Sequence, residues 1–127
     1  MKNLSSIIVV LFLLFCVNTQ AQRPILNDRN LVTSAAVAEI DALLQSTDFI
    51  TKKNKYFAAM NGAITFDVTL LHTGKVVTFF TVTSDLNHND FINFVSDFIL
   101  DHKFSFKLPK NHRHKIRHTV TFNSSNQ

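Results

Sequence analysis

The chain has 127 residues, a formal net charge of +4 at pH 7 and a single cysteine, Cys16. This length allows one domain, the lone cysteine excludes an intrachain disulfide, and two glycines with two prolines exclude collagen-like or linker sequence. Hydrophobic residues make up 46% and charged residues 17%, so we expect a folded chain, and its thirteen phenylalanines supply most of its apolar mass.

The N-terminal segment has the order of a secretory signal peptide. A positively charged start precedes an apolar run at residues 7–17, and Thr19 and Ala21 are placed like the residues before a signal-peptidase cut. The apolar run is shorter than the ~20 residues that span a bilayer. We therefore expect residues 1–21 to be removed and residues 22–127 to form one exported domain, periplasmic or secreted.

Two alternatives exist for this segment. The apolar run could be kept as a membrane anchor. The spacing before Cys16 also resembles a lipoprotein site, but Phe15 is far larger than the residue expected there, so we interpret Cys16 as part of the apolar run.

A helix is the first element expected after the cut. After an extended lead-in, Thr33 or Ser34 can cap a helix that runs to about Gln45. Its apolar residues recur on one helical face: Ala36, Val37, Ile40, Leu43 and Leu44. Residues 47–61, which contain three lysines, are predicted to be a solvated connection ending in an Asn-Gly turn.

A β-hairpin is predicted over residues 63–83. In its first strand, apolar and polar residues alternate, with Ile64, Phe66, Val68 and Leu70 on one face. A short turn around Gly74 follows. The second strand is rich in Val, Thr and Phe but mixes the two phases. Either a bulge shifts its register or both of its faces are covered.

The clearest amphipathic stripe of the chain predicts a second helix. Asn87 or Asn89 can cap it. Apolar side chains then recur at helical spacing: Phe91, Phe94, Val95, Phe98 and Ile99. We expect this stripe to pack on the sheet as core, rather than to form a ligand-binding aromatic box.

The last predicted element is a strand at residues 113–123. It follows a connection at residues 103–110, and its apolar face holds Ile116, Val120 and Phe122. The opposite face holds Lys115, Arg117, Thr119 and Thr121. The prediction is therefore an α+β domain in the order helix, strand, strand, helix, strand. Its small antiparallel three-stranded sheet contains the hairpin, and its helices lie on one face.

Several segments resemble the TonB C-terminal domain family. They are Gly62-Ala63-Ile64-Thr65-Phe66-Asp67-Val68, the turn Thr73-Gly74-Lys75-Val76, Thr83-Ser84-Asp85 before the second helix, Phe104-Ser105-Phe106 with Pro109 after it, and the closing Thr119-Val120-Thr121-Phe122-Asn123. The resemblance spans about residues 62–123. It implies the fold above and a periplasmic binding role in which the last strand contacts a partner.

The chain also departs from that family. The usual Tyr-x-Pro is replaced by Phe104 and Phe106 with a displaced Pro109, and Lys55-Tyr56-Phe57 stands where a Tyr-Pro and an acidic pair often precede the first strand. A retained anchor and a long Pro-rich spacer, which full energy transducers need, are not seen in the sequence. The resemblance therefore does not imply coupling to a proton-driven motor.

Charge is distributed unevenly along the chain. Residues 102–127 hold six Lys and Arg with no acid, whereas residues 22–101 hold six cations against nine acids. A basic surface beside the last strand favours an acidic partner. Because the chain is expected to be exported, we do not expect that partner to be a nucleic acid.

Three histidines near the last strand are weak candidates for a metal site. His112, His114 and His118 would share one strand face by period two, and imidazoles bind Zn²⁺, Cu²⁺ or Ni²⁺. The cations between them would repel a metal ion, and no Cys or carboxylate is nearby in sequence. We therefore expect solvated imidazoles, and no metal or cofactor.

No motif for nucleophilic, phosphate-binding or metalloprotease chemistry occurs, so we do not expect an enzyme. The preferred hypothesis is a protein-interaction module whose last strand pairs with an extended segment of a partner, such as an outer-membrane or envelope protein. Its partner-binding residues would be Lys110, Arg113, Lys115, Arg117, Thr119 and Thr121. The main alternative is docking of the basic C-terminal face on an anionic envelope surface.

The signal-peptide prediction is tested by sequencing the N-terminus of the exported protein. We expect it to begin at or near Gln22. Replacing Ala21 with Arg should block the cut, because signal peptidase requires a small residue at that position. Recovery of the chain from a membrane fraction with Met1 still in place would contradict the prediction.

Overall fold

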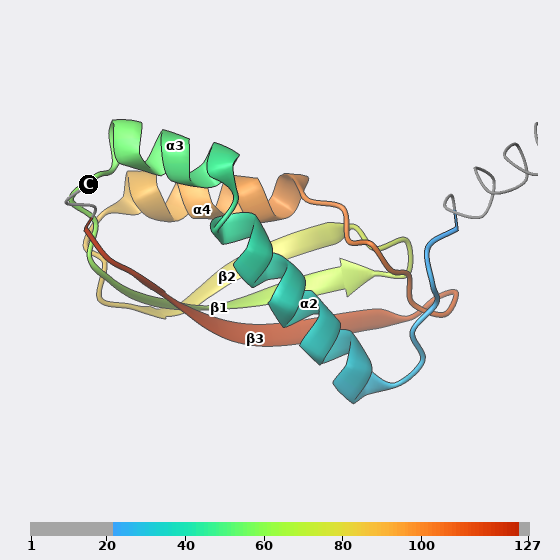
Figure 1. The fold of residues 1–127 in the computed structure, drawn as a ribbon. Helices are drawn as coiled ribbons and strands as arrows, with labels where there is room; N and C mark the ends of the chain where they lie inside the picture. The colour runs from blue at the N-terminus through green and yellow to red at the C-terminus, as the bar shows by residue number, and fades with distance from the viewer. Residues whose placement is uncertain (1–21, 125–127) are drawn as a thin grey trace, which may run out of the picture.

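The computed structural model describes residues 22–124 (Figure 1). Its elements are α2 (Arg29–Leu44), α3 (Thr47–Tyr56), β1 (Gly62–Leu71), β2 (Val76–Ser84), α4 (Asn89–Asp101) and β3 (Arg113–Phe122). The predicted α+β class is confirmed, with one helix more than expected. The predicted signal peptide lies outside the described residues. No helix within residues 22–124 combines the length and the apolar character needed to cross a membrane.

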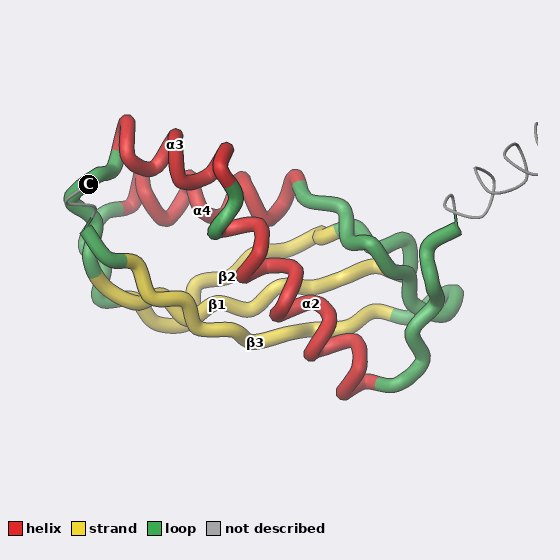
Figure 2. Tube along the Cα trace, viewed as in Figure 1, coloured by secondary structure: helices red, strands yellow, loops and turns green. Residues whose placement is uncertain are grey.

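The three strands form one antiparallel sheet in the order β2-β1-β3. Figure 2 shows this sheet as a layer with the helices on one of its faces. Pairing of β1 with β3 is regular over ten residue pairs, from Gly62↔Phe122 to Leu71↔Arg113. Pairing of β1 with β2 is interrupted twice, so of the two alternatives given for the second strand a bulge is observed, together with a second one.

The core lies between the helices and the inner face of the sheet. The alternation predicted for β1 is confirmed, because Ile64, Phe66, Val68 and Leu70 are all fully buried. Helix α4 lies over β2, and α2 crosses β3. The other face of the sheet carries no helix among the described residues.

Helix α2 begins earlier than predicted. Its N-cap is Asp28, whose Oδ1 accepts hydrogen bonds from the backbone N–H of Asn30 (2.7 Å) and of Leu31 (3.3 Å). Thr33 and Ser34 therefore lie inside the helix and do not cap it. Val32 in this first turn is apolar and buried, and it extends the stripe by one i, i+4 step before Ala36, so the sequence did contain a sign of the earlier start.

Helix α3 replaces the solvated connection that was predicted at residues 47–61. Ser46 caps it, with its hydroxyl accepting from the N–H of Phe49. Asp48 in the first turn and Lys53 and Lys55 in the last turn complement the helix dipole. A single apolar anchor, Phe49, is buried in the core at 1% exposure. Because one buried ring gives no periodic stripe, the helix was not predicted from the sequence.

Helix α4 presents two different apolar surfaces, one to the core and one to α3. Its N-cap is His88, not Asn87 or Asn89, and the imidazole Nδ1 accepts from the N–H of Phe91. Phe91, Val95 and Ile99 are fully buried, as the stripe predicted. The other two rings of the stripe, Phe94 and Phe98, are only half-buried. They contact Phe49 of α3, with ring centroids 5.1 and 5.0 Å apart.

The connection from α4 to β3 closes one end of the core. Its alternating Phe104, Phe106 and Leu108 are buried. Its backbone is bonded to the hairpin turn, with the Phe104 N–H donating to the Gly74 carbonyl over 2.9 Å. Gly74 has a φ of 83°, and a Cβ there would lie 2.5 Å from the Phe106 carbonyl oxygen. The turn therefore requires glycine for both its conformation and this close approach.

The two surfaces of α4 differ in their expected contribution to stability. Replacing the buried Phe91 with Ala should lower the free energy of unfolding by about 3–5 kcal/mol, as for other fully buried rings. Replacing Phe94 should cost less, about 1–2 kcal/mol, because its ring is half-buried and leaves no closed cavity.

Urea denaturation of both variants checks this order. Phe80→Ala is the matched control, because that ring is 67% exposed on the outer face and its loss should change stability by less than about 0.5 kcal/mol. Equal losses for Phe91→Ala and Phe94→Ala would contradict the packing described here.

Candidate functional site

Strand β3 forms one edge of the sheet and pairs only with β1 among the described strands. Hydrogen bonds at the two ends of β1 show to which side each residue points its backbone N–H and C=O groups. The Ala63 carbonyl accepts from the N–H of Asp85 (3.2 Å), and the Leu71 N–H donates to the Lys75 carbonyl (2.9 Å). Both partners lie at the β2 side. Because backbone groups alternate in direction along a strand, the odd-numbered residues of β1 face β2 and the even-numbered ones face β3.

This alternation of odd and even residues determines which backbone N–H and C=O groups of β3 have no partner in the sheet that the structure describes. Even residues of β1 pair with even residues of β3, as in Ile64↔Val120 and Val68↔Ile116. The N–H and C=O of the odd residues of β3 therefore point away from the sheet. Five residues share this orientation, and all five are exposed: Arg113, Lys115, Arg117, Thr119 and Thr121.

These outward groups are available for pairing. Among residues 22–124, no hydrogen bond other than those of the β1–β3 ladder involves the backbone of residues 113–121. The opposite edge differs, because β2 carries both bulges and its start is bridged to Lys103. A bulged edge is a poor template for a further strand. Strand β3 is therefore the regular edge of this sheet.

The outer face beside the β3 edge contains an ion-paired cluster. Arg117 donates to Asp67 through Nε (2.9 Å) and a terminal nitrogen (3.0 Å), and Lys115 Nζ lies 3.4 Å from the same carboxylate. The hydrogen bond from Arg117, with the positive charges of both cations, holds the pKa of Asp67 below its usual value. Asp67 is only 4% exposed.

This cluster changes the predicted role of the two cations. Lys115 and Arg117 were expected to select an acidic partner, but they share Asp67, so the three side chains carry a net charge of +1. Lys110 and Arg113 take part in no ion pair within the described part of the chain. Thr119 donates to, or accepts from, the Thr65 hydroxyl at 2.7 Å, which fixes the next side chain along the edge.

The inner face of β3 is fastened to α2 by two histidines. His114 Nε2 lies 2.9 Å from the Thr33 hydroxyl, and His118 Nε2 lies 2.7 Å from Asp41 Oδ1. The expectation of solvated imidazoles is therefore wrong for these two residues. Burial, together with the nearby charge of Arg29, lowers the pKa of His114.

The three histidines considered as metal candidates are not brought together. His112 lies in the loop before β3, whereas His114 and His118 are on the strand and are bound to different residues of α2. Within residues 22–124, no group of three or more His, Cys, Asp or Glu side chains has a geometry that could hold a metal ion.

One further cluster combines a serine, a histidine and a carboxylate. Glu39 accepts from Ser105 Oγ (2.8 Å) and from the Ser105 N–H (2.8 Å), and its other contact is His102 Nε2 at 2.9 Å. The serine hydroxyl donates to the acid and not to the imidazole, so the Ser–His–acid order of a catalytic triad is not formed here. This cluster joins α2 to the connection after α4.

The outward side chains of β3 were predicted from the sequence, whereas the groups that hold this strand in place were not. Asp67 is the only charged residue in the alternating strand β1, which was the available sign of a paired role. No pattern indicated that Asp41 and Thr33 would meet histidines about 80 positions away. Comparisons with known protein families, curated proteins and solved structures gave no match.

The buried His114 should make stability depend on pH. Its pKa in the folded state is lowered, so the unfolded chain binds a proton more readily, and stability falls as pH drops below about 6.5. His114→Gln keeps a polar group opposite Thr33 but cannot take up the proton.

The measurement is urea denaturation of wild type and His114→Gln at pH 7.5 and at pH 5. We expect the wild type to lose more stability between these pH values than the variant. The difference between the two proteins is used because the other titrating groups are common to both. Equal losses would show that protonation of His114 is not linked to unfolding.

Proposed function

We propose that this chain is a non-enzymatic interaction module that binds an extended segment of another protein by strand pairing at the edge of β3. The observation that carries the proposal is the row of five outward-facing N–H and C=O pairs from Arg113 to Thr121 on an unbulged strand. An incoming strand would gain main-chain hydrogen bonds along this edge.

Other features support the same proposal. The cations and hydroxyls at this edge suit an exposed strand that must stay soluble until its partner arrives. The residue pattern shared with the TonB C-terminal domain family implies a periplasmic binding role for the same strand. A cleaved signal peptide would deliver the chain to that compartment, where the partner would be an outer-membrane or other envelope protein.

A second candidate function rests on charge. The segment from Lys103 to Arg117 contains six cations and no acid, so this face could dock on an anionic envelope surface. The two functions respond differently to salt. Surface docking should weaken steeply as ionic strength rises, whereas backbone pairing should weaken little.

The free protein allows the first test of the edge. At a concentration where the chain is monomeric, hydrogen exchange should be fast at the amides of Lys115, Arg117 and Thr119. It should be slow at the alternate amides of Ile116 and His118. Slow exchange at every position would mean that no free edge exists and would remove the proposed mechanism.

The second test uses a peptide probe. The probe is a nine-residue peptide of alternating Thr and Val with two Glu in place of Thr, and its control is the same peptide with every backbone nitrogen methylated, so that neither edge can donate. Only the unmodified peptide should bind and slow exchange at the outward amides. Equal binding of both peptides would exclude backbone pairing.

Two proline variants provide matched controls on the protein. Thr119→Pro removes an outward donor, so it should weaken the unmodified peptide roughly tenfold or more while the fold survives. Val120→Pro removes a donor to β1, so it should unfold the domain. The opposite result for the two variants would contradict the parity derived above.

A further inference from the structure

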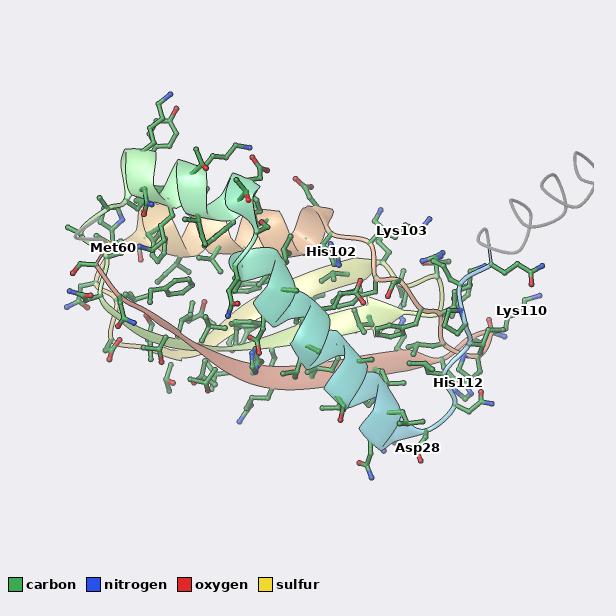
Figure 3. All side chains as sticks on the ribbon, in the orientation of Figure 1. Asp28, Met60, His102, Lys103, Lys110 and His112 are labelled. Carbon is green, nitrogen blue, oxygen red and sulfur yellow. The ribbon has the colours of Figure 1, made fainter. Side chains whose placement is uncertain are left out.

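A cavity of about 300 Å³ lies where β3 begins. Its walls come from three separate segments: the lead-in before α2, the first turn of α2, and the connection that enters β3. Figure 3 shows Asp28, Lys110 and His112 at this end of the molecule, away from Met60 at the other end. The volume is at the small end of the range of ligand sites, which is about 300–1,000 Å³.

The floor of the cavity is apolar. Leu26, Val32, Leu108 and Pro109 contribute to it. Val32 and Leu108 belong to the buried core, so this floor is held by packing and does not depend on a loop. Such a floor suits a short aliphatic or aromatic group.

The rim of the cavity is basic. Arg29, His112, Arg113 and His114 line it, and no acidic side chain does. Neither arginine takes part in an ion pair among the described residues. The neighbouring Asp28 uses its carboxylate to cap α2. The positive charge at the rim is therefore not neutralised by a lining group.

We propose that this cavity binds a carboxylate that carries a short apolar group, with Arg29 as its charge partner. The planar guanidinium matches a carboxylate with two parallel hydrogen bonds. The apolar floor distinguishes such a ligand from a bare inorganic anion, which would leave the floor uncovered.

Two sources could supply this chemistry. One is a free compound of the N-acylated amino acid type. The other is the C-terminal residue of the partner strand, and this source rests on the proposed function. A strand that pairs antiparallel with β3 ends where β3 begins, so its terminal carboxylate would arrive at the basic rim.

The test compares two probes that differ in one charge. N-acetyl-leucine and N-acetyl-leucinamide have the same apolar group, but only the first is a carboxylate. Titration of the ¹⁵N-labelled chain should shift the amides of residues 26–32 and 108–114. The carboxylate should bind at least tenfold more tightly than the amide.

Variants at the rim test the charge partner. Arg29→Gln should reduce the affinity for N-acetyl-leucine about tenfold while the affinity for the amide stays unchanged, and Arg113→Gln, on the outer-face set of β3, should reduce it less. Lys55→Gln, which removes one cation from the last turn of α3, is the control for net charge and should have no effect. A thermal melt of each variant verifies that it is folded.

Several outcomes would overturn the proposal. They are equal affinity for acid and amide, shifts confined to other regions, or a loss for Lys55→Gln as large as for the rim variants. Inorganic phosphate that competes as well as N-acetyl-leucine would show a site for any anion, which also contradicts the proposed ligand class.

A final comparison separates the two sources and the two proposals. The nine-residue peptide is prepared with a free and with an amidated C-terminus. A tenfold preference for the free acid that Thr119→Pro abolishes assigns the cavity to the partner strand. Binding of N-acetyl-leucine without any peptide binding assigns it to a free carboxylate, and in that case the strand-pairing function fails while this inference stands.

Discussion

The structure depends on how the central strand β1 divides its backbone groups. Its odd residues are bonded toward β2 and its even residues toward β3, and no bulge interrupts the second set. One choice of parity therefore fixes three properties of β3 together. It determines which amides of β3 are bonded to β1, which amides point away from the sheet, and which side chains lie on the outer face beside those outward groups. A change of one residue in this register would exchange all three.

Polar contacts and aromatic contacts have different roles in holding the helices on the sheet. Helix α2 is fastened at separate points by hydrogen bonds, from Thr33 and Asp41 to β3 and from Glu39 to the connection after α4. Helices α3 and α4 are instead joined by rings that meet around Phe49. The aromatic contacts impose little orientation, whereas the hydrogen bonds are directional and hold α2 against β3 at Thr33 and Asp41. The basic cavity lies where the first turn of α2 meets the start of β3.

Much of the fold was predictable because period two is a strong signal in this chain. Strands β1 and β3, their inward faces and the outward set on β3 follow from alternation, and Phe91, Val95 and Ile99 follow from helical spacing. Strand β2 mixes the two phases and was recognised by its Val, Thr and Phe content. Helix α3 was not predictable from a stripe, since one buried ring supports it, and its capping serine and charge pattern were the only local signs. The contacts of His118 and Glu39 join residues more than 60 positions apart, and no local pattern encodes such pairs.

The two bulges of β2 limit how copies of this chain can assemble. A protein with two regular sheet edges can add copy upon copy, left edge to right edge, and so grow into an open fibre. Here only one edge is regular, so stacking of that kind stops after the first addition. Two copies that met through β3 would use the same edge on each and would close the assembly as a pair. The irregular strand β2 therefore limits open-ended polymerisation of this domain while the β3 edge stays open.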